Sequence, residues 1–147
     1  MRVSVSKVSV NAAKGTVWKV VTEPVHVRQW QYGSVLDTDW SIGGSIRFTT
    51  EWDGQTFEQW GTVLSVDAPN KLSYSLFAPR PDLEDRDENY FTMTYELTDD
   101  HGVTVLTITQ EDPRPSDGPD DDESEDENPV LIALKGVAES LEYDDQN

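Results

Sequence analysis

The side chains that most often perform catalysis are few in this sequence and lie far apart. The two histidines are His26 and His101, and the chain has no cysteine, which excludes thiol catalysis, disulfides and thiolate metal sites. The patterns described below place His26 in a short helix and His101 in a hairpin turn. From such positions no nucleophile and general base come within hydrogen-bond reach of each other. We therefore expect a protein that is not an enzyme and that holds no cofactor.

Carboxylates are abundant, but the predicted strands direct most of them to solvent. Glu51 and Glu96 alternate with apolar residues and fall on the outer face of their strands. Glu58 is an exception because it shares a face with Trp60, although it lies near the end of its strand. The sequence therefore predicts no pair of inward carboxylates for acid–base chemistry.

Residues 111–127 form an acidic segment with ten Asp and Glu residues against Arg114 alone, a net charge of −9. Calcium binding is one function for such a run, but the segment lacks the glycine and the ligand order of an EF-hand loop. Like charges at this density repel one another. We expect a mobile, solvated loop without a metal, in which residues 112–127 move on the nanosecond scale.

The whole chain of 147 residues carries a formal charge of −18. Binders of nucleic acids and of anionic membranes use Lys and Arg to neutralise phosphates, so this charge argues against both partners. The charge outside the acidic segment is compatible with a salt-adapted proteome without requiring one. The N-terminus alternates apolar and polar residues, unlike a signal peptide, and no apolar run is long enough to cross a bilayer. We expect a cytoplasmic protein that is a monomer.

Alternating apolar and polar residues predict seven strands, at residues 3–10, 35–40, 45–52, 57–66, 72–77, 90–97 and 103–110. In the first strand the alternation slips at Lys7, which indicates a bulge. A helix with Asn11 as its N-cap is expected to end before Pro24, and a short helix at residues 25–29 leads to Trp30. Residues 78–89 are expected to form a long loop. Asn128-Pro129 begins a final helix over residues 129–143.

The strands share one apolar face, and the final helix has one apolar stripe that includes Leu134 and Val137. The sheet is the only large surface on which this stripe can be buried. The sequence thus predicts a single α+β domain over residues 1–147, with a curved antiparallel sheet around a long C-terminal helix. In the ambiguous fourth strand we expect Trp60, Leu64 and Val66 to face inward.

A curved sheet around a helix encloses a volume that large residues must fill or that a ligand occupies. Aromatic side chains of the inner face are candidates for the lining of such a cavity, and filling of an ordinary core is the alternative. Three inward polar residues, Tyr74, Tyr95 and Gln110, must each find a hydrogen-bond partner if buried. The candidate lining residues are Trp30, Phe48, Trp52, Trp60, Tyr74, Leu76, Met93, Tyr95, Gln110, Leu134 and Val137.

Several short motifs in this order resemble a known family over nearly the whole chain. They comprise Val17-Trp18 with Thr22, Pro24 and Trp30, then residues 40–48, residues 61–67 with Pro69, residues 72–75, residues 107–110, and Leu134-Lys135 through Leu141-Glu142. This set is similar to START-like (SRPBCC) proteins related to the activator of the heat-shock protein 90 ATPase. The resemblance implies the helix-grip fold, with a cavity between the sheet and the C-terminal helix.

The leading hypothesis from the sequence is a binding protein for a small hydrophobic or amphipathic molecule. One alternative is an interaction protein, related to stress or associated with a chaperone. The other is an enzyme of the cyclase or dehydratase kind found on related folds. Fold analogy alone does not separate these hypotheses.

Overall fold

The computed structural model describes residues 2–31, 33–79, 84–113, 121–123 and 129–146. The strands formed by these residues are β1 (Arg2–Val10), β2 (Val35–Asp37), β3 (Ser45–Trp52), β4 (Gln55–Asp67), β5 (Lys71–Phe77), β6 (Phe91–Asp100), β7 (Val103–Asp112) and β8 (Asp121–Glu123). The helices are α1 (Lys14–Thr22), α2 (Pro24–Trp30) and α3 (Pro129–Gln146), with one 3-10 turn at Asp87–Asn89. Among the described helices, none combines the length and apolar composition needed to cross a bilayer.

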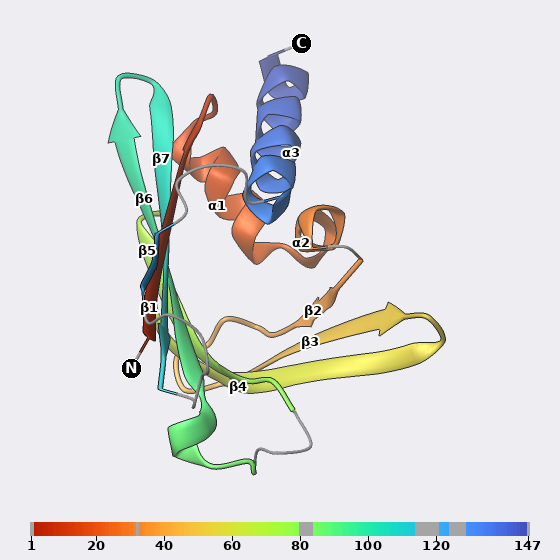
Figure 1. Ribbon diagram of the computed structural model, residues 1–147. Coiled ribbons are helices and arrows are strands. Elements are labelled where there is room, and N and C mark those ends of the chain that lie inside the picture. Colours follow the sequence, from red (N-terminus) through yellow and green to blue (C-terminus); the bar gives the residue numbers. More distant parts are fainter. Residues whose placement is uncertain (1, 32, 80–83, 114–120, 124–128, 147) are drawn as a thin grey trace.

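One sheet contains all the described strands, in the order β2-β3-β4-β5-β6-β7-β1-β8. Neighbours from β2 to β1 pair antiparallel, and β8 lies parallel to β1. The sheet bends strongly, so that β3 and β4 run across the base of the molecule while β1 and β5–β7 stand upright (Figure 1). All three helices lie on the concave side. The curved sheet and C-terminal helix expected from the sequence are confirmed.

β1 pairs with β7 in one continuous register, from Arg2 opposite Asp112 to Val10 opposite Thr104. The bulge expected at Lys7 is therefore absent, and that prediction was wrong. Ser4 and Ser6 share the inner face with Val10, while Val3 is largely exposed. Serines at this edge thus face the interior, where alternating valines had been expected.

β4 contains a bulge between Val63 and Ser65. Before the bulge, Gln59 and Val63 lie on the inner face, and after it Val66 does, because the extra residue changes the phase of the alternation. Leu64 is 45% exposed. The inward assignment was therefore right for Val66 and wrong for Leu64.

Near the bulge, Gly61 brings β4 and β5 unusually close together. A Cβ atom at Gly61 would overlap the carbonyl oxygen of Ser75 and lie 2.5 Å from its carbonyl carbon. Both are backbone atoms, so neither moves without displacing the strand. Only glycine, which has no side chain, fits where β4 and β5 lie this close together.

Each of the three helices differs slightly from the expected one, and α2 extends one residue beyond residues 25–29 at both ends. The N-cap of α1 is Ala13, without a side-chain hydrogen bond, and the backbone N–H of Asn11 instead donates to Oε2 of Glu139 at 2.8 Å. α3 continues to Gln146, three residues beyond the expected end. Asn11 therefore does not cap α1, and its backbone instead links the end of β1 to α3.

The acidic segment is described only in part. Glu111 and Asp112 extend β7, and Asp121–Glu123 form β8 beside Val3–Val5. These five residues were expected in a loop and lie in strands because the β7 ladder continues and the edge of β1 offers unpaired backbone groups. Residues 114–120 and 124–128, where most of the mobility was expected, lie outside the described residues.

Candidate ligand-binding cavity

A cavity of about 340 Å³ lies between the concave face of the sheet and the helices α2 and α3. This volume is at the lower end of the range typical of small-molecule sites, roughly 300–1,000 Å³. Seven of the residues predicted from the sequence line it: Trp30, Phe48, Tyr74, Leu76, Met93, Tyr95 and Gln110.

Aromatic rings pack in series along the floor of the cavity. The ring centroids of Phe48 and Tyr74 are 5.8 Å apart, and those of Tyr74 and Tyr95 are 6.0 Å apart. Trp40 packs on Tyr74 at 6.1 Å. Contacts of this length are favourable beyond the burial of area. The floor is therefore a largely aromatic surface.

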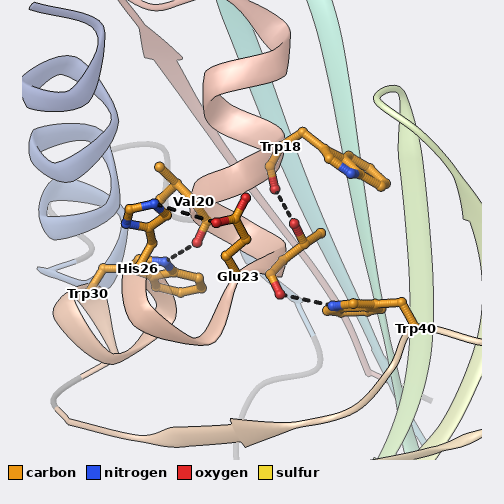
Figure 2. A network of polar contacts seen from close by, with 7 residues as sticks. Trp18, Val20, Glu23, His26, Trp30 and Trp40 are labelled. Atoms are coloured by element: carbon orange, nitrogen blue, oxygen red, sulfur yellow. Dashed lines mark hydrogen bonds and ion pairs between the residues drawn. The ribbon is translucent and has the colours of Figure 1, made fainter. Parts of the chain in front are cut away.

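The wall formed by α2 is attached to the end of α1 through two tryptophans, Trp30 of α2 and Trp40 (Figure 2). The last carbonyls of a helix have no partner within it. The indole N–H of Trp30 donates to the carbonyl of Val20 at 2.8 Å, and that of Trp40 donates to the carbonyl of Thr22 at 2.9 Å. Since Pro24 prevents α1 from continuing, these bonds satisfy two of its terminal carbonyls, and the first holds Trp30 beside the cavity.

The two tyrosines of the floor form a buried pair. The hydroxyl of Tyr74 donates to that of Tyr95 at 3.2 Å. Burial raises the pKa of Tyr74 well above its ordinary value of 10.0, and the nearby Tyr95 adds to the rise. Burial also raises the pKa of Tyr95. Both phenols are therefore neutral at physiological pH.

Further polar residues line the cavity without any charged side chain among them: Ser4, Ser6, Gln31, Ser34, Thr50 and Gln59. Ser34 and Thr50 share a hydroxyl–hydroxyl hydrogen bond of 2.7 Å. The sequence analysis missed these residues, because a serine or glutamine on a strand gives no signal of the face on which it lies. Gln59 was missed for a more specific reason, since the bulge reverses the phase of β4.

Trp60 is not part of the cavity, and its inward assignment was wrong. It lies directly opposite Arg47 on β3, on the outer face of the sheet. Its ring packs against Phe77 at 5.5 Å, and its N–H donates to Oδ2 of Asp85 at 3.1 Å. Gln59 takes the inward position.

The remaining predicted residues are placed as follows. Leu134 is fully buried in the packed core, and Val137 packs against that core half-buried. Neither lines the cavity, where α3 contributes Val130 and Leu131 instead, one turn nearer its start. The side chain of Trp52 lies outside the described residues.

Neither histidine is among the described residues that line the cavity. His26 is in α2, with Nε2 at 3.9 Å from Oε1 of Glu23, and His101 is at the exposed tip of the β6–β7 hairpin. Within the described ranges, no three His, Asp or Glu side chains gather closely enough to hold a metal ion. The described lining residues of the cavity carry no formal charge.

Solved structures with the same architecture cover nearly the whole chain. A solution structure of a protein from Cytophaga hutchinsonii is 25% identical, with a TM-score of 0.69 over 100% of this chain and 98% of that one. A crystal structure from Mesorhizobium loti is 18% identical, with a TM-score of 0.70 over 95% and 98%. An HSP90 activator from Plasmodium falciparum is 17% identical, with a TM-score of 0.63 over 79% and 76%.

No curated protein matches the chain by sequence. The family model described as "Activator of Hsp90 ATPase homolog 1-like protein" matches residues 11–141. This range includes every described strand except β1, which ends at Val10, and it extends into the second half of α3. The chain belongs to the family of Activator of Hsp90 ATPase homolog 1-like proteins.

Proposed function

We propose that this protein binds a small hydrophobic or amphipathic molecule in the cavity between the sheet and the helices α2 and α3. The observation that carries the proposal is a space of about 340 Å³ with aromatic residues along its floor and no charged side chain among its described lining residues. Such a lining favours apolar ligands with a few hydrogen-bonding groups. We further propose that the protein acts as a cytoplasmic monomer, which its lack of cysteine and its charge of −18 support.

Fluorescence titration with N-phenylnaphthylamine, a neutral apolar probe, tests the proposal. We expect saturable binding by the parent protein and none by Met93→Trp, because Met93 lines the cavity and a larger side chain fills it. Thr94→Trp is the matched control, since Thr94 lies on the same strand and faces the other side of the sheet. Ser6→Leu reduces the space from the β1 side and is expected to weaken binding as well.

Near-ultraviolet circular dichroism establishes that each variant is folded. Native mass spectrometry of protein purified from its host then searches for a co-purified small molecule. Absence of probe binding by the folded parent, together with absence of any co-purified species, would overturn the proposed function.

A second candidate function is binding to the chaperone Hsp90, which is favoured by the family match over residues 11–141. One structural relative, from Plasmodium falciparum, is itself described as an HSP90 activator. The test is the ATPase rate of the host's own Hsp90 with and without this protein. A stimulated rate supports this candidate, and an unchanged rate together with no binding in calorimetry excludes it.

A further inference from the structure

The polar residues of the cavity lie in two groups at opposite ends. One group comes from the β3–β4 side of the sheet and from the segment after α2: Gln31, Ser34, Thr50 and Gln59. The other comes from β1 and β7: Ser4, Ser6 and Gln110. Strands β5 and β6 lie between the two groups in the sheet. The polar ends are therefore separated by the middle of the cavity.

The middle of the cavity is mainly apolar. β5 contributes Tyr74 and Leu76, and β6 contributes Phe91, Met93 and Tyr95. The two phenol hydroxyls in this region share one hydrogen bond, with Tyr74 as donor, so the pair leaves only the hydroxyl proton of Tyr95 to donate. Between the polar ends the lining thus presents rings and aliphatic side chains.

Each end retains hydrogen-bonding capacity. Ser34 and Thr50 share one hydrogen bond at 2.7 Å, and two hydroxyls with one bond between them leave one proton to donate. Ser4 lies directly opposite Gln110 across the β1–β7 ladder. The side-chain amide of Gln110 has no hydrogen-bond partner among the described residues. A ligand group at either end therefore finds a donor and an acceptor.

The cavity does not suit a charged ligand. None of its described lining residues offers a charge of opposite sign, and burial of an unpaired ion is costly. An anion is also repelled by the protein's charge of −18. Hydrogen bonds at the two ends compensate only for the desolvation of neutral polar groups.

From this arrangement we infer that the ligand is an uncharged, elongated molecule with an apolar, flat body and a hydroxyl or carbonyl group at each end. Four strand spacings separate Thr50 on β3 from Gln110 on β7, which corresponds to roughly 19 Å measured along the curved sheet and to less in a straight line across its concave side. The body rests on the aromatic floor, one end reaches Ser34 and Thr50, and the other reaches Gln110 and Ser4. This inference names the ligand class for the proposed function and rests on it.

A series of stilbenes with one common body tests the inference by calorimetry or fluorescence. The series comprises stilbene itself, the derivative with one para-hydroxyl, the derivative with a hydroxyl at both para positions, and the corresponding dicarboxylate. We expect affinity to rise about three- to tenfold with each hydroxyl, the usual gain from one hydrogen bond. The dicarboxylate is expected not to bind.

Variants at the two ends assign each gain to its residues. Ser34→Ala combined with Thr50→Val removes the hydroxyls of one end, and Gln110→Leu removes the amide of the other. Each is expected to lower the affinity for the dihydroxy compound to that for the monohydroxy compound, while stilbene binds as before. Ser73→Ala is the matched control, because Ser73 shares a hydroxyl–hydroxyl bond of 2.7 Å with Ser65 on the outer face of the sheet.

The outcomes separate the inference from the proposed function. Equal binding of all three neutral stilbenes, or tight binding of the dicarboxylate, would overturn the inference and leave the proposed function standing. So would end variants that behave like Ser73→Ala. If neither N-phenylnaphthylamine nor any stilbene binds the folded parent, the proposed function fails and the inference fails with it.

Discussion

The hydroxyl of Tyr74 on β5 donates a hydrogen bond of 3.2 Å to the hydroxyl of Tyr95 on β6, and both phenols are buried. The two residues come from neighbouring antiparallel strands, and their rings stack with an angle of 28° between planes. The bond satisfies the donor of Tyr74 and a lone pair of Tyr95 in an otherwise apolar region.

This pair predicts non-additive effects of substitution on stability. Tyr74→Phe or Tyr95→Phe alone leaves one buried hydroxyl without its partner, and each is expected to lower the free energy of unfolding by about 1–3 kcal/mol. The double substitution removes both polar groups and is expected to cost less than the sum of the single ones. Urea unfolding of the four proteins measures this, and strictly additive costs would show that the two hydroxyls are not coupled.

The same pair predicts a dependence of stability on alkaline pH. The pKa of both phenols is raised in the folded protein, chiefly by burial. In the unfolded chain they lose their protons near pH 10. Their contribution to stability is therefore complete below about pH 10 and is lost as the pH rises from there through the folded-state values.

The decline above pH 10 is expected to be shallower in the protein carrying both Tyr74→Phe and Tyr95→Phe. Tyr143→Phe is the control, since the side chain of Tyr143 is 69% exposed, and its decline is expected to match that of the parent. Denaturant unfolding at a series of pH values gives the slopes. A double variant with the parent's slope would contradict the assignment.

Leu134 and Ile132 are both on α3 and differ in burial, which gives a paired prediction. Leu134 is 0% exposed and lies in the core, whereas Ile132 is 61% exposed. Leu134→Ala is expected to cost about 2–5 kcal/mol through lost contacts and an empty space. Ile132→Ala is expected to change stability by less than about 0.5 kcal/mol. A mild effect of Leu134→Ala would place it beside the cavity rather than in packed core.

Gly61 predicts intolerance of even one added carbon atom. Gly61→Ala forces β4 away from the backbone of Ser75 and is expected to cost about 2 kcal/mol or more. Gly136→Ala on α3 is the control, because a Cβ there meets nothing within 4 Å. It is expected to stabilise the protein by up to about 1 kcal/mol, as alanine favours helix. Thermal unfolding of both variants distinguishes these opposite signs.

Much of the fold could be predicted because turns and periodicity agree along the chain. The strand at residues 45–52 was predicted with the bounds observed. It begins after Gly43 and ends at Asp53-Gly54, and all three residues have positive φ, at 85°, 51° and 74°. Such backbone conformations favour glycine, asparagine and aspartate, so the sequence itself marks the turns.

The lining of the cavity could be predicted less fully. Apolar residues such as Phe48 and Met93 show their face by alternation, and seven of the predicted residues line the cavity: Trp30, Phe48, Tyr74, Leu76, Met93, Tyr95 and Gln110. Trp60 was misplaced because a bulge of one residue, between Val63 and Ser65, reverses the alternation of inward and outward residues along β4. No residue type in this part of the sequence marks the bulge. Ser4 and Ser6 were missed because hydroxyls occur on either face of a strand.

The two outermost strands decide whether copies of the sheet join edge to edge. β2 and β8 are each only three residues long, so neither offers a long row of backbone groups to a neighbouring molecule. β8 consists of Asp121, Asp122 and Glu123 and covers part of β1, whose alternating valines would otherwise attract a foreign strand. If a second copy approaches this edge with its own β8, two acidic strands come together. Pairing of two sheets through this edge is therefore expected to be disfavoured, because it would bring like charges together.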